Sequence, residues 1–306
     1  MKLIQTLLMI FLCMACGQKK EQEAADFFLK GNLAASKKDF QGAVRMYQES
    51  LEKKPDFVDA MNNLGMVYFK QGKIEESLIQ YEKALSLEPN YIPAVYNRSE
   101  ALFSSNNFKS CLEDLKVVAA AYPDSFFVYQ SLGNTYTALK NNKLALENYE
   151  KSIQKNPKAV QTFINRGFLY FESNDFKNAK KDFEMALTLD SNQDVALNNL
   201  SLVYAKEKLF DKALTSIDQA INIKSGNATY LNNKGYYLLE LNQLQEGNAL
   251  IETSIRLQPD NPYALKNKGI YLLKSNKKKE AKKLFIEAKK LKDDLPEIDE
   301  LIKQTN

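Results

Sequence analysis

Apolar residues recur along the chain at spacings of three and four, which places them on one face of an α-helix. The pattern repeats in blocks of 34 residues that follow one another without insertion or deletion. The eight blocks are residues 24–57, 58–91, 92–125, 126–159, 160–193, 194–227, 228–261 and 262–295. A period of this length indicates a repeat array in which each block forms one supersecondary unit.

Each block predicts two helices separated by a turn. The first helix is poor in bulky residues at its eighth position, where only Gly or Ser occurs: Gly31, Gly65, Ser99, Gly133, Gly167, Ser201, Gly235 and Gly269. Gly and Ser are weak helix formers, so we expect the two helices of a pair to approach closely at this position. The second helix carries a small residue and, four positions later, a large apolar one, such as Ala43 and Tyr47.

Turn residues mark both ends of the second helix. Residues that tolerate a left-handed backbone stand between the two helices, at Gly72, Asn106, Asn174, Asn242 and Asn276. Proline ends five blocks, at Pro55, Pro89, Pro123, Pro157 and Pro259, and a proline there stops the second helix. After the last block, residues 296–306 predict a capping helix and tail, with Ile298, Leu301 and Ile302 on its apolar side.

The pattern over residues 24–295 resembles the tetratricopeptide repeat (TPR) family. The resemblance implies an all-α fold, a right-handed superhelical solenoid of eight 34-residue helix-turn-helix repeats with a C-terminal capping helix. It also implies that the first helices line a concave groove, that the partners are other proteins or peptides, and that the protein is not an enzyme.

The composition removes several kinds of chemistry. The 306 residues contain no His, which excludes histidine metal ligands and Ser-His or Cys-His nucleophile pairs. A net charge of +4 gives no general attraction to nucleic acid. Beyond the leader the sole cysteine is Cys111, which occupies a small-residue position and is predicted to be a buried, inert thiol. We therefore expect no metal, no cofactor and no small-molecule substrate.

The first sixteen residues read as a targeting segment. One Lys precedes an apolar run, and Ala15 stands directly before Cys16. This resembles a bacterial lipoprotein signal, which implies lipidation at Cys16 and location in the cell envelope, on the periplasmic face or the cell surface. Residues 17–23 would then form a short tether. An ordinary cleaved signal or an uncleaved anchor is the alternative.

Asparagine dominates the sixth position of the blocks. It occurs at Asn63, Asn97, Asn165, Asn199, Asn233 and Asn267. An amide both donates and accepts hydrogen bonds, so an exposed row could hold a peptide backbone without reading its side chains. The row resembles the asparagine ladder with which some tetratricopeptide domains grip extended peptides. The alternative is that Asn is simply frequent at this position.

Aromatic and aliphatic side chains accompany the amides on the first helices. We assign Phe69, Phe103, Phe168 and Phe171 to peptide binding, and place Met66, Tyr96, Phe127, Ile164 and Tyr236 on the same face. The alternative is that some of them pack between neighbouring first helices.

Two function classes follow, with a third as a remote possibility. The first is a membrane-anchored adaptor that holds a peptide or partner protein in its groove. The second is a structural subunit of a cell-envelope machine for secretion, motility or cell-wall work. The third is an enzyme with an unrecognised carboxylate site, for which Glu100 and Glu172 are the acids to inspect.

Overall fold

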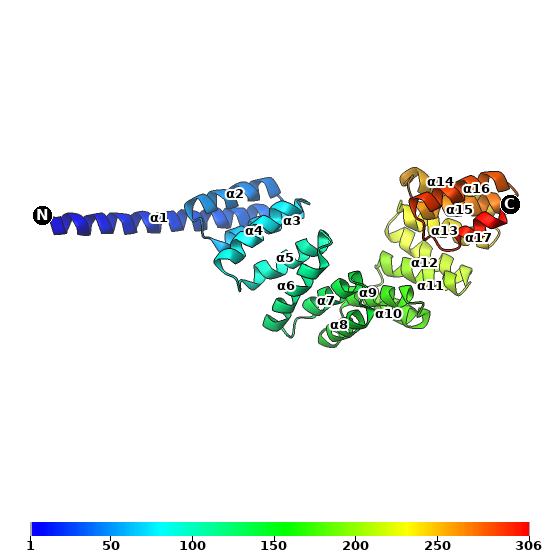
Figure 1. Cartoon of the computed structure of the whole chain (residues 1–306), viewed down its shortest axis with the longest axis horizontal. Helices are drawn as coiled ribbons and strands as arrows, with labels where there is room; N and C mark the ends of the chain where they lie inside the picture. Colours follow the sequence, from blue (N-terminus) through cyan, green and yellow to red (C-terminus); the bar gives the residue numbers. More distant parts are fainter. Residues whose placement is uncertain (1, 306) are drawn as a thin grey trace. The chain divides into compact units, whose positions relative to one another are not determined.

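A computed structural model describes the backbone of residues 2–305 and the side chains of residues 18–305. Every regular element in these residues is an α-helix (Figure 1). The helices are α1 (Lys2–Ser36), α2 (Phe40–Lys53), α3 (Val58–Lys70), α4 (Ile74–Leu87), α5 (Ile92–Ser104), α6 (Phe108–Ala121), α7 (Phe126–Ala138), α8 (Asn142–Lys155), α9 (Val160–Glu172), α10 (Phe176–Leu189), α11 (Asp194–Lys206), α12 (Phe210–Ile223), α13 (Ala228–Glu240), α14 (Leu244–Leu257), α15 (Pro262–Lys274), α16 (Lys278–Leu291) and α17 (Ile298–Gln304).

The chain forms two compact units. Unit 1 comprises Met1–Asn156 and contains the helix pairs from α1/α2 to α7/α8. Unit 2 comprises Pro157–Asn306 and contains the pairs from α9/α10 to α15/α16, followed by α17. From α3 to α15, each first helix starts at the first residue of a 34-residue block. The predicted all-α fold of helix-turn-helix repeats is confirmed.

The first helix of the first pair is much longer than the others. Its backbone is helical from Lys2 to Ser36, so residues 17–23, which we expected to be a short tether, are helical and continuous with the first repeat. Cys16 lies outside the residues whose side chains the structure describes. Within the described part of the chain, no helix is both long and apolar enough to cross a bilayer.

The turn inside each pair requires one residue with positive φ. Asn106 has φ 60°, and the next N–H, that of Asn107, donates to the carbonyl of Leu102 over 2.8 Å, which closes the end of α5. The Gly and Asn residues predicted for this position all adopt positive φ. Three repeats place lysine there instead, at Lys38, Lys140 and Lys208.

The two helices of a pair touch at the eighth position of the block. A Cβ on Gly65 would lie 2.6 Å from Cε1 of Tyr81, and one on Gly133 would lie 2.5 Å from Cδ1 of Tyr149. Carbon atoms cannot approach so closely, so these rings pack directly against the backbone of the first helix. Where Ser99 replaces the glycine, the second helix carries the aliphatic Leu115 at the facing position instead of a ring.

We expect the residue at the eighth position of the first helix and the residue that faces it on the second helix to be energetically coupled. Gly167→Ser places a Cβ 2.8 Å from Cε1 of Phe183 and should destabilise the protein by about 1–3 kcal/mol through overpacking. Phe183→Leu alone should also destabilise it, because it leaves a cavity. Together the two changes recreate the Ser–Leu pairing of Ser99 and Leu115, so the double variant should lose less free energy of unfolding than the sum. Urea denaturation of all four proteins measures this, and simple additivity would contradict it.

The capping helix predicted at the C-terminus is present and packs against α16. Leu295 and Ile298 are buried in the same apolar cluster as Phe285 of α16. Lys266 of α15 also joins the cap, since its Nζ donates to the carbonyl of Pro296 over 3.3 Å. The last repeat therefore does not end on an open apolar face.

Candidate functional site

The first helices of successive repeats lie against one another within each unit. In unit 1, α3 contacts both α1 and α5, and in unit 2 the contacts run α9–α11, α11–α13 and α13–α15. Among the described helices, the second helices of successive repeats make no comparable contact. The side of each unit lined by first helices, called here the first-helix face, is thus the more tightly spaced one.

Asparagine side chains bridge these first helices in unit 1. Nδ2 of Asn97 in α5 donates to Oδ1 of Asn62 in α3 over 2.9 Å. Asn62 in turn donates to Asn63, which donates to Asn32 in α1 over 2.9 Å. The chain of bonds ends at the hydroxyl of Tyr47, which donates to the same Asn32 oxygen over 2.7 Å. Three successive repeats are therefore connected through one relay of amides.

Unit 2 contains the same bridges. Nδ2 of Asn233 donates to Oδ1 of Asn198 over 2.9 Å, and Nδ2 of Asn267 donates to Oδ1 of Asn232 over 3.0 Å. Asn198 also donates to Asn199. In three bridges a sixth-position amide donates to the fifth-position amide of the preceding repeat, from Asn97, Asn233 and Asn267, whereas Asn63 donates to Asn32 instead. The asparagines thus hold neighbouring repeats together, a role that the sequence analysis did not assign to them.

The six asparagines at the sixth position of the blocks are less exposed than expected. Asn199 and Asn267 are only 9% and 6% exposed, whereas Asn63, Asn97, Asn165 and Asn233 are half-buried. The expectation of an exposed row is therefore wrong for two of the six amides. Asn267 is buried in its bridge to Asn232, whereas Asn199 accepts a bond from Asn198 of its own helix.

Removing a bridging amide should destabilise the protein. Asn198→Ala deletes the buried acceptor of the Asn233 bond and leaves the half-buried Asn233 donor without that partner, which should cost about 1–3 kcal/mol. The control is Asn222→Ala, at an exposed position of α12, where the better helix former should change stability by less than about 0.7 kcal/mol. Thermal unfolding followed by circular dichroism compares the two, and equal effects would contradict a structural role for the bridges.

The apolar residues assigned to the groove divide into two groups. Phe168 is 44% exposed on α9. Phe69 and Phe103 are half-buried and pack on the core of unit 1, and Phe171 is half-buried and packs on the core around Phe183 in unit 2. Packing between helices therefore accounts for three of the four phenylalanines, which was the alternative interpretation.

Ile164 and Phe127, which we also placed on this face, differ in exposure. Ile164 is buried, with 3% exposure, so its placement on the accessible face is wrong. Phe127 of α7 is 57% exposed, more than any other aromatic ring of the first helices among the described side chains. Its ring centroid lies 3.8 Å from that of Phe126. Accessible aromatic surface on the first helices therefore comes from Phe127, Phe168 and, at 40% exposure, Tyr263 of α15.

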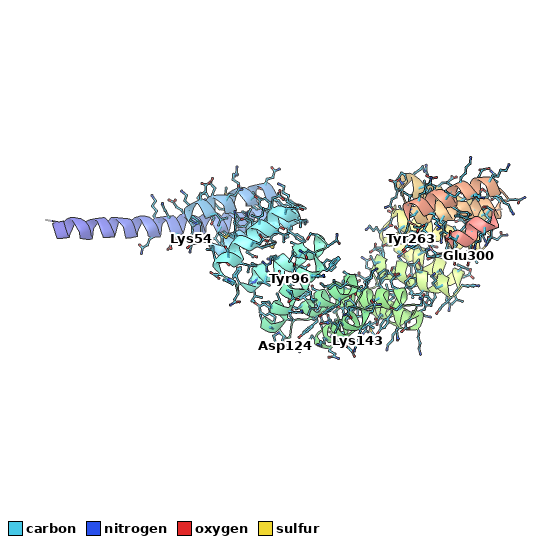
Figure 2. All side chains as sticks on the ribbon, in the orientation of Figure 1. Lys54, Tyr96, Asp124, Lys143, Tyr263 and Glu300 are labelled. Carbon is cyan, nitrogen blue, oxygen red and sulfur yellow. The ribbon has the colours of Figure 1, made fainter. Side chains whose placement is uncertain are left out.

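A cavity of about 180 Å³ lies between α5 and α7 in unit 1. It is lined from α5 by Tyr96 (labelled in Figure 2), Glu100 and Phe103, from α7 by Phe127, Ser131 and Thr135, and from α6 by Cys111. Among the first helices described within a unit, only α5 and α7 lack the close approach seen at the other junctions. At this junction the fifth position of α5 is Tyr96 and the sixth of α7 is Ser131, so no amide bridge forms there. The α9–α11 junction, with Ile164 at the fifth position, is close without such a bridge, so the missing bridge accompanies the open space and is not its full cause.

Glu100 is the charged group of this cavity. Its Oε1 accepts a hydrogen bond from the hydroxyl of Ser131 over 3.3 Å. Burial raises the pKa of this carboxyl, and the Ser131 bond opposes the shift only in part. The thiol of Cys111 is buried as predicted, and burial raises its pKa as well, so the unreactive protonated form is favoured.

The second acid named from the sequence, Glu172, is exposed at the end of α9. Among the described residues, no group of three or more Cys, Asp or Glu side chains is arranged to hold a metal ion. The chemistry that the cavity offers is therefore that of one partly desolvated carboxylate next to three aromatic rings.

Comparison with known proteins agrees with this fold. The crystal structure of the APC/C hetero-tetramer Cut9–Hcn1 is similar with a TM-score of 0.69 and 11% identity over 87% of this chain and 52% of that chain, so this chain spans about half of its length. The structure of MamA, residues 41 to the end, from Desulfovibrio magneticus RS-1 has a TM-score of 0.53 and 22% identity over 56% of this chain and 97% of that chain. No curated protein matches the sequence.

Family models match the sequence directly. Those described as Tetratricopeptide repeat match residues 58–91, 128–158, 160–193 and 195–227, and one described as TPR repeat matches residues 31–72. Together these matches cover more than half of the chain, and they coincide with helix pairs of both units. The chain therefore belongs to the tetratricopeptide repeat family.

Proposed function

We propose that the protein is an interaction scaffold that holds an extended peptide segment of a partner protein on the first-helix face of one of its units. The observation that carries the proposal is the accessible aromatic surface of Phe127 and Phe168, since aromatic side chains are enriched at the centres of protein interfaces. The proposal assigns the protein no catalytic activity.

Some of the half-buried asparagine side chains support this proposal, because they keep unused hydrogen-bonding groups. An asparagine side chain can form four hydrogen bonds, and Asn97 and Asn233 each use one N–H in their bridge. Their Oδ1 atoms and second N–H groups remain to pair with a peptide backbone. Asn97 and Asn233 are therefore proposed as peptide contacts. Oδ1 of Asn63 already accepts a bond from Asn62, and Oδ1 of Asn165 accepts one from Gln161, so these two, like the buried Asn199 and Asn267, are not among the proposed contacts.

Photocrosslinking tests which face binds. A benzoylphenylalanine in place of Phe168 on α9 should crosslink a partner in cells, and the same residue in place of Met185 on α10 should not. The two sites belong to one repeat and have similar exposure, 44% and 39%, so their difference reports the face rather than accessibility.

The crosslinking result also separates the two candidate functions. Exposed apolar residues on second helices, such as Ile79, Met185 and Ile286, are the observation that favours a structural subunit. A partner caught only at position 185, in fixed stoichiometry, would contradict the adaptor and support that second function in an envelope complex.

We further propose that the scaffold is anchored to a bacterial envelope membrane by lipid on Cys16. The support is the sequence of the leader, in which Ala15 precedes Cys16 after an apolar run. A multiply acylated cysteine would anchor the protein stably, because a single acyl chain binds only marginally.

Metabolic labelling tests the anchor. The chain expressed in a bacterium should incorporate radioactive palmitate and stay with the membrane fraction, and Cys16→Ala should lose both label and membrane association. Cys111→Ala is the matched control, because that thiol is buried and should not affect the label. Label that persists in Cys16→Ala, or none in the natural chain, would refute the anchor and leave the scaffold untouched.

A further inference from the structure

The cavity between α5 and α7 combines an acid, aromatic walls and access to solvent. Glu100 receives one hydrogen bond, from Ser131, and in the part of the chain that the structure describes no Lys or Arg forms an ion pair with it. The rings of Tyr96, Phe103 and Phe127 line the same space. A carboxylate with aromatic faces around it is the arrangement that attracts an organic cation, by charge and by the negative ring faces.

The size of the cavity fits one side chain. Its volume is about 180 Å³, and a cavity of about 150 Å³ can hold a benzene molecule. The long methylene stem of Lys or Arg suits a path along aromatic surface, because such stems are apolar while the head group is charged. Phe127, at 57% exposure, offers that surface next to the solvent.

We propose that this cavity is a subsite for one basic side chain of the bound peptide, with Glu100 as its counter-ion and Tyr96, Phe103 and Phe127 as its walls. The inference rests on the proposed function, since it specifies a residue of the peptide that the first-helix face holds. It adds side-chain selectivity to a surface whose amides contact only the backbone.

The position of the subsite follows from the break in the amide row. At the α3–α5 junction the Asn62–Asn97 bond draws the helices together and fills the interface. At the α5–α7 junction the corresponding residues are Tyr96 and Ser131, and the short Ser131 side chain reaches Glu100 instead. The space that the Asn62–Asn97 bridge closes at α3–α5 stays open at α5–α7, and the Glu100 carboxylate lines it.

A basic residue gains more from this cavity than a neutral one. Taking a carboxylate out of water is costly unless a partner compensates it. A cation from the peptide supplies that partner, whereas a neutral side chain of the same length would make only apolar contacts and leave the carboxylate unpaired. A charge-assisted hydrogen bond contributes enough for about tenfold or more in affinity.

The test begins with selection of peptides from a displayed random library on the full-length chain. Three proteins are used: the natural chain, Glu100→Gln, and the control Glu172→Gln, which removes an exposed carboxylate of α9 outside the cavity. Gln keeps the acceptor for the Ser131 hydroxyl, so Glu100→Gln should fold normally. Peptides selected by the natural chain and by Glu172→Gln should share a Lys or Arg at one position, and those selected by Glu100→Gln should not.

Affinities of a selected peptide then measure the coupling. For a lysine-containing peptide, replacing that Lys with the neutral isostere norleucine should weaken binding to the natural chain about tenfold or more. The same replacement should change binding to Glu100→Gln by less than about twofold. Fluorescence anisotropy gives both constants.

Each outcome has a distinct meaning. Peptides that bind the natural chain with no basic position, or equal loss on norleucine replacement in both proteins, would overturn the subsite and leave the scaffold function standing. If none of the three proteins enriches any peptide, the proposed function fails, and the subsite fails with it.

Discussion

The close approach of the two helices in each pair is the contact on which the rest of the structure depends. A solenoid repeat touches only its neighbours, so its stability is built from the interface within each pair and the interface to the next pair. Within the pair, rings such as Tyr81 and Tyr149 lie on the bare backbone of Gly65 and Gly133. That packing fixes the orientation of each first helix, and with it the side chains that reach the neighbouring repeat and those that face a partner.

The sequence predicts most of this architecture for physical reasons. A 34-residue period read with the 3.6-residue helix period assigns most core positions, though not that of Ile164, and Gly or Asn between two apolar runs identifies a left-handed turn. The positive φ of Lys140 could not be predicted in this way, because lysine has no preference for positive φ and adopts it here only because the turn of the repeat requires it. The arginines Arg98 and Arg166 each donate two hydrogen bonds to an aspartate of the second helix in the same repeat, Asp114 and Asp182 respectively. Both pairs are 16 residues apart, a spacing from which these contacts could have been predicted.

The candidate site was only partly predictable. The sequence places Asn97 and Asn233 on the first helices, but it does not show whether an amide reaches the adjacent helix, because that depends on the distance between repeats. The same distance decides whether Phe103 is accessible or packed. The cavity beside Glu100 was not predicted. The sequence shows Tyr96 at a position where three other repeats carry Asn, but not that space would remain beside it.

The same asparagine side chains can either bridge neighbouring repeats or bind a peptide. This competition determines where on the first-helix face selectivity between peptides can arise. A bridge stabilises the interface between repeats but buries part of the amide, and at Asn267 it leaves almost no surface. What remains elsewhere in the row are backbone-type donors and acceptors, which hold any extended peptide equally well. Discrimination between peptides needs a pocket for a side chain. The α5–α7 junction lacks a bridge, which contributes about 1 kcal/mol of hydrogen bonding elsewhere, and the cavity there is where the Glu100 carboxylate of the proposed subsite distinguishes one ligand side chain from another.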